Sequence, residues 1–338
     1  ASADSVLWIE PALPPLVERN DSARLASEVD ELHAEPYAYL GSGVSVMVYD
    51  GNVANASHPD FGDRLSVRED TSVGNHATWV SGVIAGDGSA SGGVYRGMAP
   101  AATIQSYKHD VQGEGWLYSD PSDIEEDFGD ALNVHGAVIA NVSLGTNVSF
   151  NGFPCEWTGD YNVTSSVIDA VVRGSLGAPF RVVWSAGNER SSARCEDEQI
   201  DGGYHSIVPP AGAKNHITVG AINSDDESMT YFSSWGPTDD GRIKPDLTAS
   251  GCQVSDDGGI TTTSVSGYAT VCGTSFSAPV VTGIGALVIE AWRERYPGRQ
   301  DLQNSSLKAL LANTGADLGN PGPDCQFGYG TVRARAAI

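Results

Sequence analysis

Four polar residues, far apart along the chain, carry groups that together could perform nucleophilic catalysis: Asp50, His76, Asn188 and Ser275. A serine hydroxyl is a weak nucleophile at neutral pH unless a neighbouring base takes its proton. An imidazole suits that task because its pKa lies near neutrality, and a carboxylate can fix its tautomer. A side-chain amide and the main-chain N–H of Ser275 could stabilise a developing oxyanion.

Each of these residues also has a simpler interpretation. Taken alone, Ser275 is more often a helix N-cap than a nucleophile, and Asp50 is more often a turn residue. Asn188 alone would be a loop former, and His76 an ordinary, partly buried histidine. Their joint order along the chain favours the catalytic interpretation. The remaining histidines lie in no comparable motif and are interpreted as ordinary structural residues. They are His58, His109, His135, His205 and His216.

The segments around these residues predict an α/β fold with a doubly wound, mostly parallel central sheet flanked by helices. Short β-branched runs, typical of buried parallel strands, lie at 44–49, 137–144, 181–186 and 216–222. Helices are expected at 76–84, 122–132, 165–172 and 274–295. We find no linker long enough to divide the chain.

Ligands of such sheets bind beyond the carboxyl ends of the strands. Asp50 and Asn188 each follow a predicted strand, whereas His76 and Ser275 each open a predicted helix. We therefore expect the four side chains to converge at one rim of the sheet.

The motifs that contain these residues resemble those of the subtilisin-like serine proteases, in the same order. They are "VMVYDGNV" (46–53) with "HPDF" (58–61), "NHATWVSGVIAG" (75–86), "VVWSAGNE" (182–189) and "GTSFSAP" (273–279). Further similar segments are "FSSWGPTDDGRIKPDLTASG" (232–251) and "FGYGTVRARAAI" (327–338). The resemblance covers residues 20–338 and implies a single subtilisin-like catalytic domain over that range.

The histidine motif departs from the family pattern, which usually reads His-Gly-Thr-His. This chain has Ala77 and Trp79 at two of those positions, and Trp235 stands where arginine is common. Because His76 itself is kept, we expect these departures to affect local packing and not the base.

The resemblance implies a serine endopeptidase that forms an acyl-enzyme on Ser275, with His76 as general base. In that scheme Asp50 orients the imidazole and Asn188 contributes to the oxyanion hole. No cofactor is expected for the chemistry itself.

The same resemblance implies that an extended polypeptide substrate pairs with an edge of the protein, as in β-augmentation. The residues expected at that edge are Ser143, Leu144 and Gly145, with Gly113, Glu114 and Gly115 on the opposite edge. Ser185, Ala186 and Gly187 are expected to help wall the specificity pocket. Its floor cannot be located from the sequence, and the family implies only a large apolar or broad preference.

Other functions compete with this interpretation. An α/β-hydrolase would need Gly-x-Ser-x-Gly with the serine before its acid and histidine. Ser277 occupies the last glycine position and both partners precede Ser275, which excludes that class. A transpeptidase or macrocyclase on the same scaffold stays open. A non-catalytic peptide-binding module would be expected to lack a member of the triad.

The charge of the chain limits its partners. It carries 43 acidic and 19 basic residues, for a net charge of −24, which disfavours nucleic acid and anionic membranes. Acidic segments at 123–127, 225–227 and 239–240 match no known calcium-loop spacing, and each alone is more simply explained as a solvated loop; together with the habit of the family they suggest structural Ca²⁺. No Cys/His spacing indicates zinc. We expect a monomer.

Five cysteines fit two disulfides and one free thiol in an exported protein. We expect the pairs Cys155–Cys195 and Cys252–Cys272, each joining loops that the predicted fold brings together. A secreted or extracytoplasmic protein is therefore expected, although the cysteine count by itself leaves a reducing compartment open.

The first 19 residues differ from the rest, because three prolines among them predict an extended arm. "VLWIEP" (6–11) followed by "NDSAR" (20–24) resembles the junction between an inhibitory propeptide and the mature enzyme in one subtilisin branch. No signal peptide is recognisable at Ala1. We expect 1–19 to be such an arm or propeptide remnant, and the propeptide to be a partner.

Overall fold

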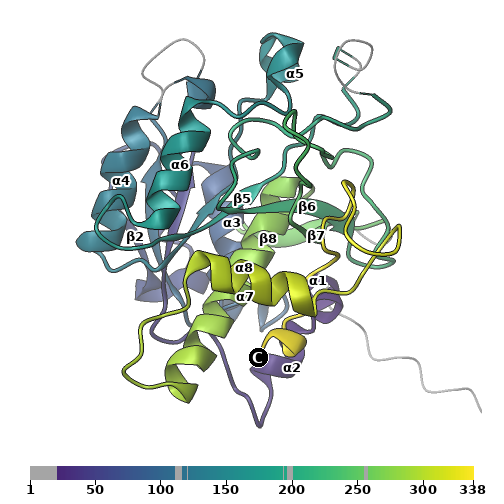
Figure 1. Cartoon of the computed structure of the whole chain (residues 1–338). Coiled ribbons are helices and arrows are strands. Elements are labelled where there is room, and N and C mark those ends of the chain that lie inside the picture. The colour runs from purple at the N-terminus through teal and green to yellow at the C-terminus, as the bar shows by residue number, and fades with distance from the viewer. Residues whose placement is uncertain (1–20, 111–115, 120, 193, 196–200, 255–257) are drawn as a thin grey trace, which may run out of the picture.

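The computed structural model describes residues 21–110, 116–119, 121–192, 194–195, 201–254 and 258–338. Its centre is a seven-stranded sheet of order β2-β3-β1-β4-β5-β6-β7 in which all neighbouring strands run parallel (Figure 1). The strands are β1 (Ser45–Asp50), β2 (Leu65–Val67), β3 (Thr103–Lys108), β4 (Ile139–Val142), β5 (Arg181–Ser185), β6 (Ile217–Asn223) and β7 (Leu247–Cys252). A separate antiparallel hairpin is formed by β8 (Ile260–Thr263) and β9 (Tyr268–Val271).

Helices cover both faces of this sheet (Figure 1). One face carries α3 (Asn75–Ala85), α7 (Thr274–Arg295) and α8 (Asn304–Thr314), with α1 (Asp21–Ala26) and α2 (Val29–His33) packed beside them. The other face carries α4 (Ser122–Asn133) and α6 (Val163–Arg173). Short elements in the connections are α5 (Val148–Asn151), η2 (Pro59–Arg64), η3 (Ser89–Ser91), η4 (Trp116–Tyr118), η5 (Cys155–Trp157) and η6 (Arg335–Ala337). The doubly wound α/β prediction is confirmed.

The alternation of side chains along β1 shows why its sequence is apolar on both faces. Val46 and Val48 pack into the core that contains α3 and α7, whereas Met47 and Tyr49 pack into the core that contains α4 and α6. Successive side chains of a strand point to opposite faces, so a strand between two helical layers needs an unbroken apolar run.

Helix α7 is the central support of the first layer. Its length and composition would suffice to cross a membrane, but 89% of its most apolar 18-residue window is buried inside the protein. Glycines let it approach its neighbours closely. A Cβ added at Gly283 would lie 2.5 Å from Met98 Cβ, and one added at Gly285 would lie 2.7 Å from Ile139 Cδ1. The helix that begins beside Ser275 is therefore fixed tightly against the sheet.

Strand β1 lies at the point where the chain reverses its direction across the sheet, since β3 flanks it on one side and β4 on the other. The loops that leave the carboxyl ends of β1 and β4 diverge there and open a crevice. Asp50 ends β1, and Ser143 follows β4 directly.

The two expected disulfides are confirmed. Cys155 and Cys195 are bonded with their α-carbons 5.5 Å apart, and Cys252 and Cys272 with theirs 4.7 Å apart. Cys325 carries a free thiol.

Candidate active site

A cavity of about 390 Å³ opens at the carboxyl ends of the strands, and all four predicted catalytic side chains line it. Asp50 enters from the end of β1, His76 from the first turn of α3, Asn188 from the loop after β5, and Ser275 from the first turn of α7. The sheet topology thus brings together residues separated by up to 225 positions (275 − 50).

Asp50 and His76 are in direct polar contact in this cavity. His76 Nδ1 lies 2.8 Å from Asp50 Oδ1 and 2.9 Å from Asp50 Oδ2. The carboxylate is 1% exposed and also accepts a hydrogen bond of 2.7 Å from the N–H of Gly51. Because a carboxylate only accepts, it keeps the proton of a neutral imidazole on Nδ1 and leaves Nε2 free to take another.

Two opposing effects set the pKa of His76. Burial lowers this pKa, but Coulombic attraction to Asp50 and the hydrogen bond with it raise it, and the net result lies above the usual 6.5. The imidazole side chain is 37% exposed, so Nε2 can reach a ligand in the cavity. An imidazole base is most effective where its pKa lies near the working pH, and the raised pKa of His76 moves that working range upward.

Ser275 points at the neighbouring strand end in this conformation. Its Oγ donates to the carbonyl oxygen of Ser143 at 3.3 Å, while Ser143 Oγ donates to the carbonyl oxygen of Ser275 at 2.9 Å. Within the described part of the chain, His76 and Ser275 form no hydrogen bond with each other in this conformation. A turn about the Cα–Cβ bond to another staggered rotamer redirects the Ser275 hydroxyl. Catalytic hydrogen bonds are often long or absent without substrate and tighten only when it binds.

Asn188 is held with its amide in a defined orientation. Its Oδ1 accepts hydrogen bonds from the main-chain N–H and from the hydroxyl of Thr274, both at 3.0 Å. The Nδ2 hydrogens are therefore the end of the amide that can donate to a ligand beside Ser275. Thr274 also accepts from the N–H of Gly187 at 3.2 Å, so one threonine fixes both the asparagine and the loop that carries it.

The unusual residue in the histidine motif is explained by aromatic packing. The Trp79 ring lies 6.3 Å from the His76 ring and 6.3 Å from the Phe276 ring, and the His76 and Phe276 rings are 5.8 Å apart. Trp79 Nε1 donates to Ser264 Oγ at 3.2 Å. The tryptophan thus links α3 to α7 behind the imidazole. Trp235, the residue that stands where the family commonly has arginine, packs against a cation: the Arg190 guanidinium lies 4.2 Å above its ring.

Most of the predicted substrate-contacting residues lie at the same cavity. Its lining includes Ser143, Leu144, Gly145, Ser185 and Gly187. Ala186 is fully buried behind this lining. Gly113, Glu114 and Gly115 lie outside the described residues.

Sequence reasoning missed several lining residues: Gly51, Asn52, Asn147, Val208 and Thr274. Thr274 and Gly51 are adjacent to predicted catalytic residues, and that adjacency could have indicated them. Nothing in the sequence singles out Val208, which lies in a loop between β5 and β6.

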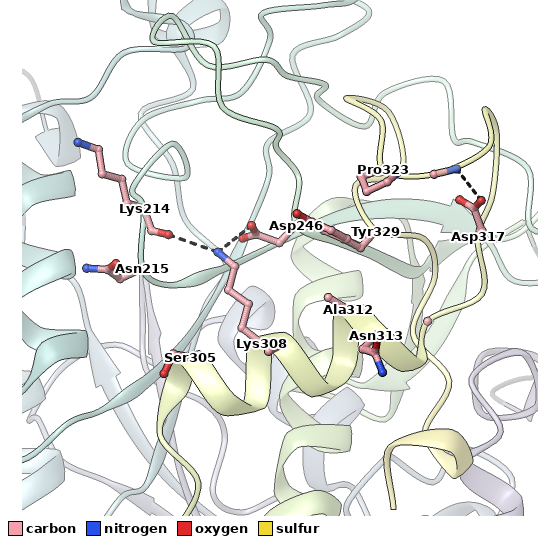
Figure 2. A pocket seen from close by; sticks show the side chains of 13 residues that line it. Lys214, Asn215, Asp246, Ser305, Lys308, Ala312, Asn313, Asp317, Pro323 and Tyr329 are labelled. Carbon is pink, nitrogen blue, oxygen red and sulfur yellow. Dashed lines mark hydrogen bonds and ion pairs between the residues drawn. The ribbon is translucent and has the colours of Figure 1, made fainter.

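A larger cavity of about 690 Å³ lies elsewhere, where Lys214, Asp246 and α8 meet the C-terminal loop (Figure 2). Lys308 Nζ is 2.7 Å from Asp246 Oδ1 and 3.3 Å from the carbonyl oxygen of Lys214. The second Asp246 oxygen accepts from Lys244 Nζ at 2.7 Å, and burial lowers the pKa of that lysine to about 7. No histidine lines this cavity, and its buried carboxylate, Asp246, is paired with Lys244 and Lys308, so the described lining offers no imidazole base for nucleophilic catalysis.

Comparison with known proteins agrees with this geometry. The model of the subtilase family matches residues 41–330. Serine protease AprX of Bacillus subtilis (strain 168) is 28% identical over 348 residues, covering 94% of this chain and 71% of the relative. Subtilisin E of the same strain is 28% identical over 317 residues, covering 90% of this chain and 68% of the relative. The solved structure of the Clostridium perfringens CspB protease has a TM-score of 0.73 at 18% identity, covering 94% of this chain and 98% of that one, which shows a shared fold. The chain belongs to the subtilase family and is a subtilisin-like serine endopeptidase.

Proposed function

We propose that the protein hydrolyses peptide bonds through an acyl-enzyme on Ser275. His76 is the general base, Asp50 orients it, and Asn188 donates to the oxyanion. The observation that carries this proposal is the contact of 2.8 Å between His76 Nδ1 and Asp50 Oδ1, in a cavity that Asn188 and Ser275 also line.

The reaction begins when the Ser275 hydroxyl turns from Ser143 toward Nε2 of His76. The oxygen attacks the scissile carbonyl as Nε2 takes the proton, and the Asp50 carboxylate stabilises the imidazolium. The negative charge on the substrate oxygen is met by Asn188 Nδ2 and by the N–H of Ser275, at the positive end of the α7 dipole. His76 then protonates the leaving amine, and a water activated by the same imidazole releases the acyl group.

The substrate is an extended polypeptide that lies between two walls of the cavity. One wall is the segment 143–145 and the other is the segment 185–188, both leaving carboxyl ends of neighbouring strands. Main-chain groups of an extended peptide can pair with such an edge, whereas side chains enter the space between the walls. The opposite edge predicted at 113–115 stays a prediction.

The identity of the group that accepts the acyl chain separates a hydrolase from a transpeptidase or macrocyclase on the same scaffold. We expect hydrolysis, because the imidazole is 37% exposed and water can reach it. Cleavage of a defined peptide in H₂¹⁸O, followed by mass spectrometry, should give a carboxyl product that contains ¹⁸O. Cyclic or amine-extended products without ¹⁸O would contradict hydrolysis and support acyl transfer to an amine.

Several features of the protein's setting are part of the same proposal. Two disulfides favour an oxidising, extracytoplasmic location. The net charge of −24 disfavours nucleic acid and anionic membranes as partners. The role of 1–19 as an extended arm or propeptide remnant stays a prediction, because those residues lie outside the described part of the chain. A monomeric state also stays a prediction.

Structural calcium also stays a prediction, and the carboxylates of the three acidic segments do not fit a shared site. Among the described residues, no group of three or more His, Cys, Asp or Glu side chains could hold a metal. Asp123 accepts from the Tyr49 hydroxyl at 2.7 Å, and Asp240 accepts from Arg242 at 2.8 Å. Within the described part of the chain, any such ion would need ligands other than clustered carboxylates.

Removal of calcium offers a direct test of that prediction. When the free Ca²⁺ concentration is a hundred times the Kd of the site, binding stabilises the fold by about 2.7 kcal/mol. Removal of the ion by EDTA should therefore lower Tm by about 5 °C. Excess Ca²⁺ should restore the original value, and Mg²⁺ serves as the control cation. An unchanged Tm after chelation would contradict structural calcium.

A further inference from the structure

The residue at the inner end of the active-site cavity, Val208, was not among the sequence-based predictions. It is fully buried and lines the cavity together with both walls. A Cβ added at Gly145 would lie 2.7 Å from Val208 Cγ2, and a Cβ added at Gly187 would lie 2.6 Å from the same methyl group. One methyl group therefore contacts both walls and fills the space between their α-carbons.

The position of this methyl group relative to the reacting atoms defines which part of a substrate it meets. The scissile carbonyl carbon has to lie between Ser275 Oγ and Asn188 Nδ2 for attack and oxyanion binding. Ser275 Oγ is 3.3 Å from the carbonyl oxygen of Ser143. The substrate residue that supplies the scissile carbonyl, the P1 residue, therefore lies beside the wall 143–145. Its side chain then enters the space between the walls, at whose inner end Val208 lies.

The segment that carries Val208 is hydrogen-bonded to one wall at Ala186 and to Thr146, the residue after the other wall, so it cannot retreat easily. The N–H of Val208 donates to the carbonyl oxygen of Ala186 at 3.3 Å. The next carbonyl, that of Pro209, accepts from the N–H of Thr146 at 2.9 Å and from its hydroxyl at 2.7 Å.

Trp184, the residue before the second wall, is also joined to the first wall, since its Nε1 donates to the carbonyl oxygen of Leu144 at 2.6 Å. Widening the space for a large side chain would break several of these buried hydrogen bonds, each costing about 1–3 kcal/mol when left unmade.

We propose that Val208 sets the substrate preference of this enzyme by closing the inner end of the P1 pocket, so that peptides with a small P1 side chain are cleaved in preference to those with a large aromatic one. This inference rests on the proposed function, because it needs Ser275 as nucleophile. It departs from the large apolar or broad preference that the family resemblance implies. Alanine and glycine fit above the methyl group, whereas a phenylalanine ring would overlap it.

The test compares kcat/KM for two peptide anilides, Ala-Ala-Pro-Ala and Ala-Ala-Pro-Phe, on the full chain. The unmodified enzyme should favour the alanine substrate at least 10-fold, within the range that an added group in an apolar pocket produces. Val208→Ala and then Val208→Gly should raise kcat/KM for the phenylalanine substrate in steps, by at least 10-fold in total. The ratio of the two kcat/KM values should move toward the phenylalanine substrate in the same steps.

The matched control is Val171→Ala, which removes the same atoms from a fully buried valine on α6, outside the cavity. It should leave the ratio of the two kcat/KM values unchanged. Active-site titration with a serine-directed phosphonate corrects every variant for its folded fraction. The substrate ratio of the unmodified enzyme tests the proposal even if a variant fails to fold.

Two failures can be told apart. An unmodified enzyme that takes the phosphonate but cleaves the phenylalanine substrate as fast as the alanine substrate would overturn this inference alone. An enzyme that neither takes the phosphonate nor cleaves any peptide would overturn the proposed function, and the inference would fall with it.

Discussion

Replacement of Ser275 by alanine is expected to lower kcat on casein and on peptide anilides by about 10⁶-fold, the magnitude known for the nucleophile of a subtilisin. In the proposed mechanism the Ser275 hydroxyl forms the acyl-enzyme, so its removal abolishes the covalent route. The residual rate should stay above that of water, because Asn188 and the peptide-binding walls are unchanged. Initial rates at saturating substrate provide the measurement.

The same substitution at Ser277 is the matched control. Ser277 lies in the same helical turn, is fully buried, and donates only to the carbonyl oxygen of Thr274 at 3.0 Å. Ser277→Ala should therefore keep kcat within a fewfold of the original. If Ser275→Ala retained full activity while folding normally, the assignment of the nucleophile would be wrong.

The second large effect is expected from Asp50→Asn, which should lower kcat by about 10⁴-fold. A neutral amide no longer requires the proton on Nδ1 of His76, so the imidazole can present a protonated Nε2 to Ser275. The substitution also removes the two contributions that raise the pKa of His76, namely attraction to the carboxylate and its hydrogen bond. Because the imidazole acts as a base only when neutral, the acidic limb of the kcat/KM–pH profile should move to lower pH.

Asp60→Asn is the control for this prediction. Asp60 is as deeply buried as Asp50 but lies outside the cavity, where it accepts from the N–H of Ala90 and the Tyr268 hydroxyl, both at 2.8 Å. Its replacement should affect stability and leave the position of the acidic limb in place. An Asp50→Asn enzyme with an unshifted acidic limb would contradict the electrostatic role given to the carboxylate.

The parts of the fold that the sequence predicted well are those with strong local signals. The apolar run of α7 and the proline and glycine after it gave both ends of that helix as observed, Thr274–Arg295. The β-branched runs located β1, β4, β5 and β6 to within a few residues. The strand β3 reads "TIQSYK", with polar residues inside a buried strand, and periodicity therefore did not reveal it. Helix α8 was missed because its apolar face is narrow and meets only the end of the core.

The candidate site was predictable where function depends on residue type and less so where it depends on shape. A nucleophile, a base, an acid and an amide can be identified by their chemistry and by the ends of elements on which they lie. Val208 is an ordinary valine in sequence, and only the three-dimensional contact of its methyl group with Gly145 and Gly187 gives it significance. The rotamer of Ser275, directed at Ser143, is likewise a property of the folded site.

Covalent labelling tests the central claim most directly. A peptidyl phosphonate reacts only with a serine whose proton is taken by a neighbouring base and whose oxyanion is stabilised. Peptide mapping by mass spectrometry should find one adduct, on Ser275, formed at a rate that drops sharply in His76→Ala. An adduct on another serine, or casein hydrolysis by a protein that takes no label at Ser275, would contradict the account.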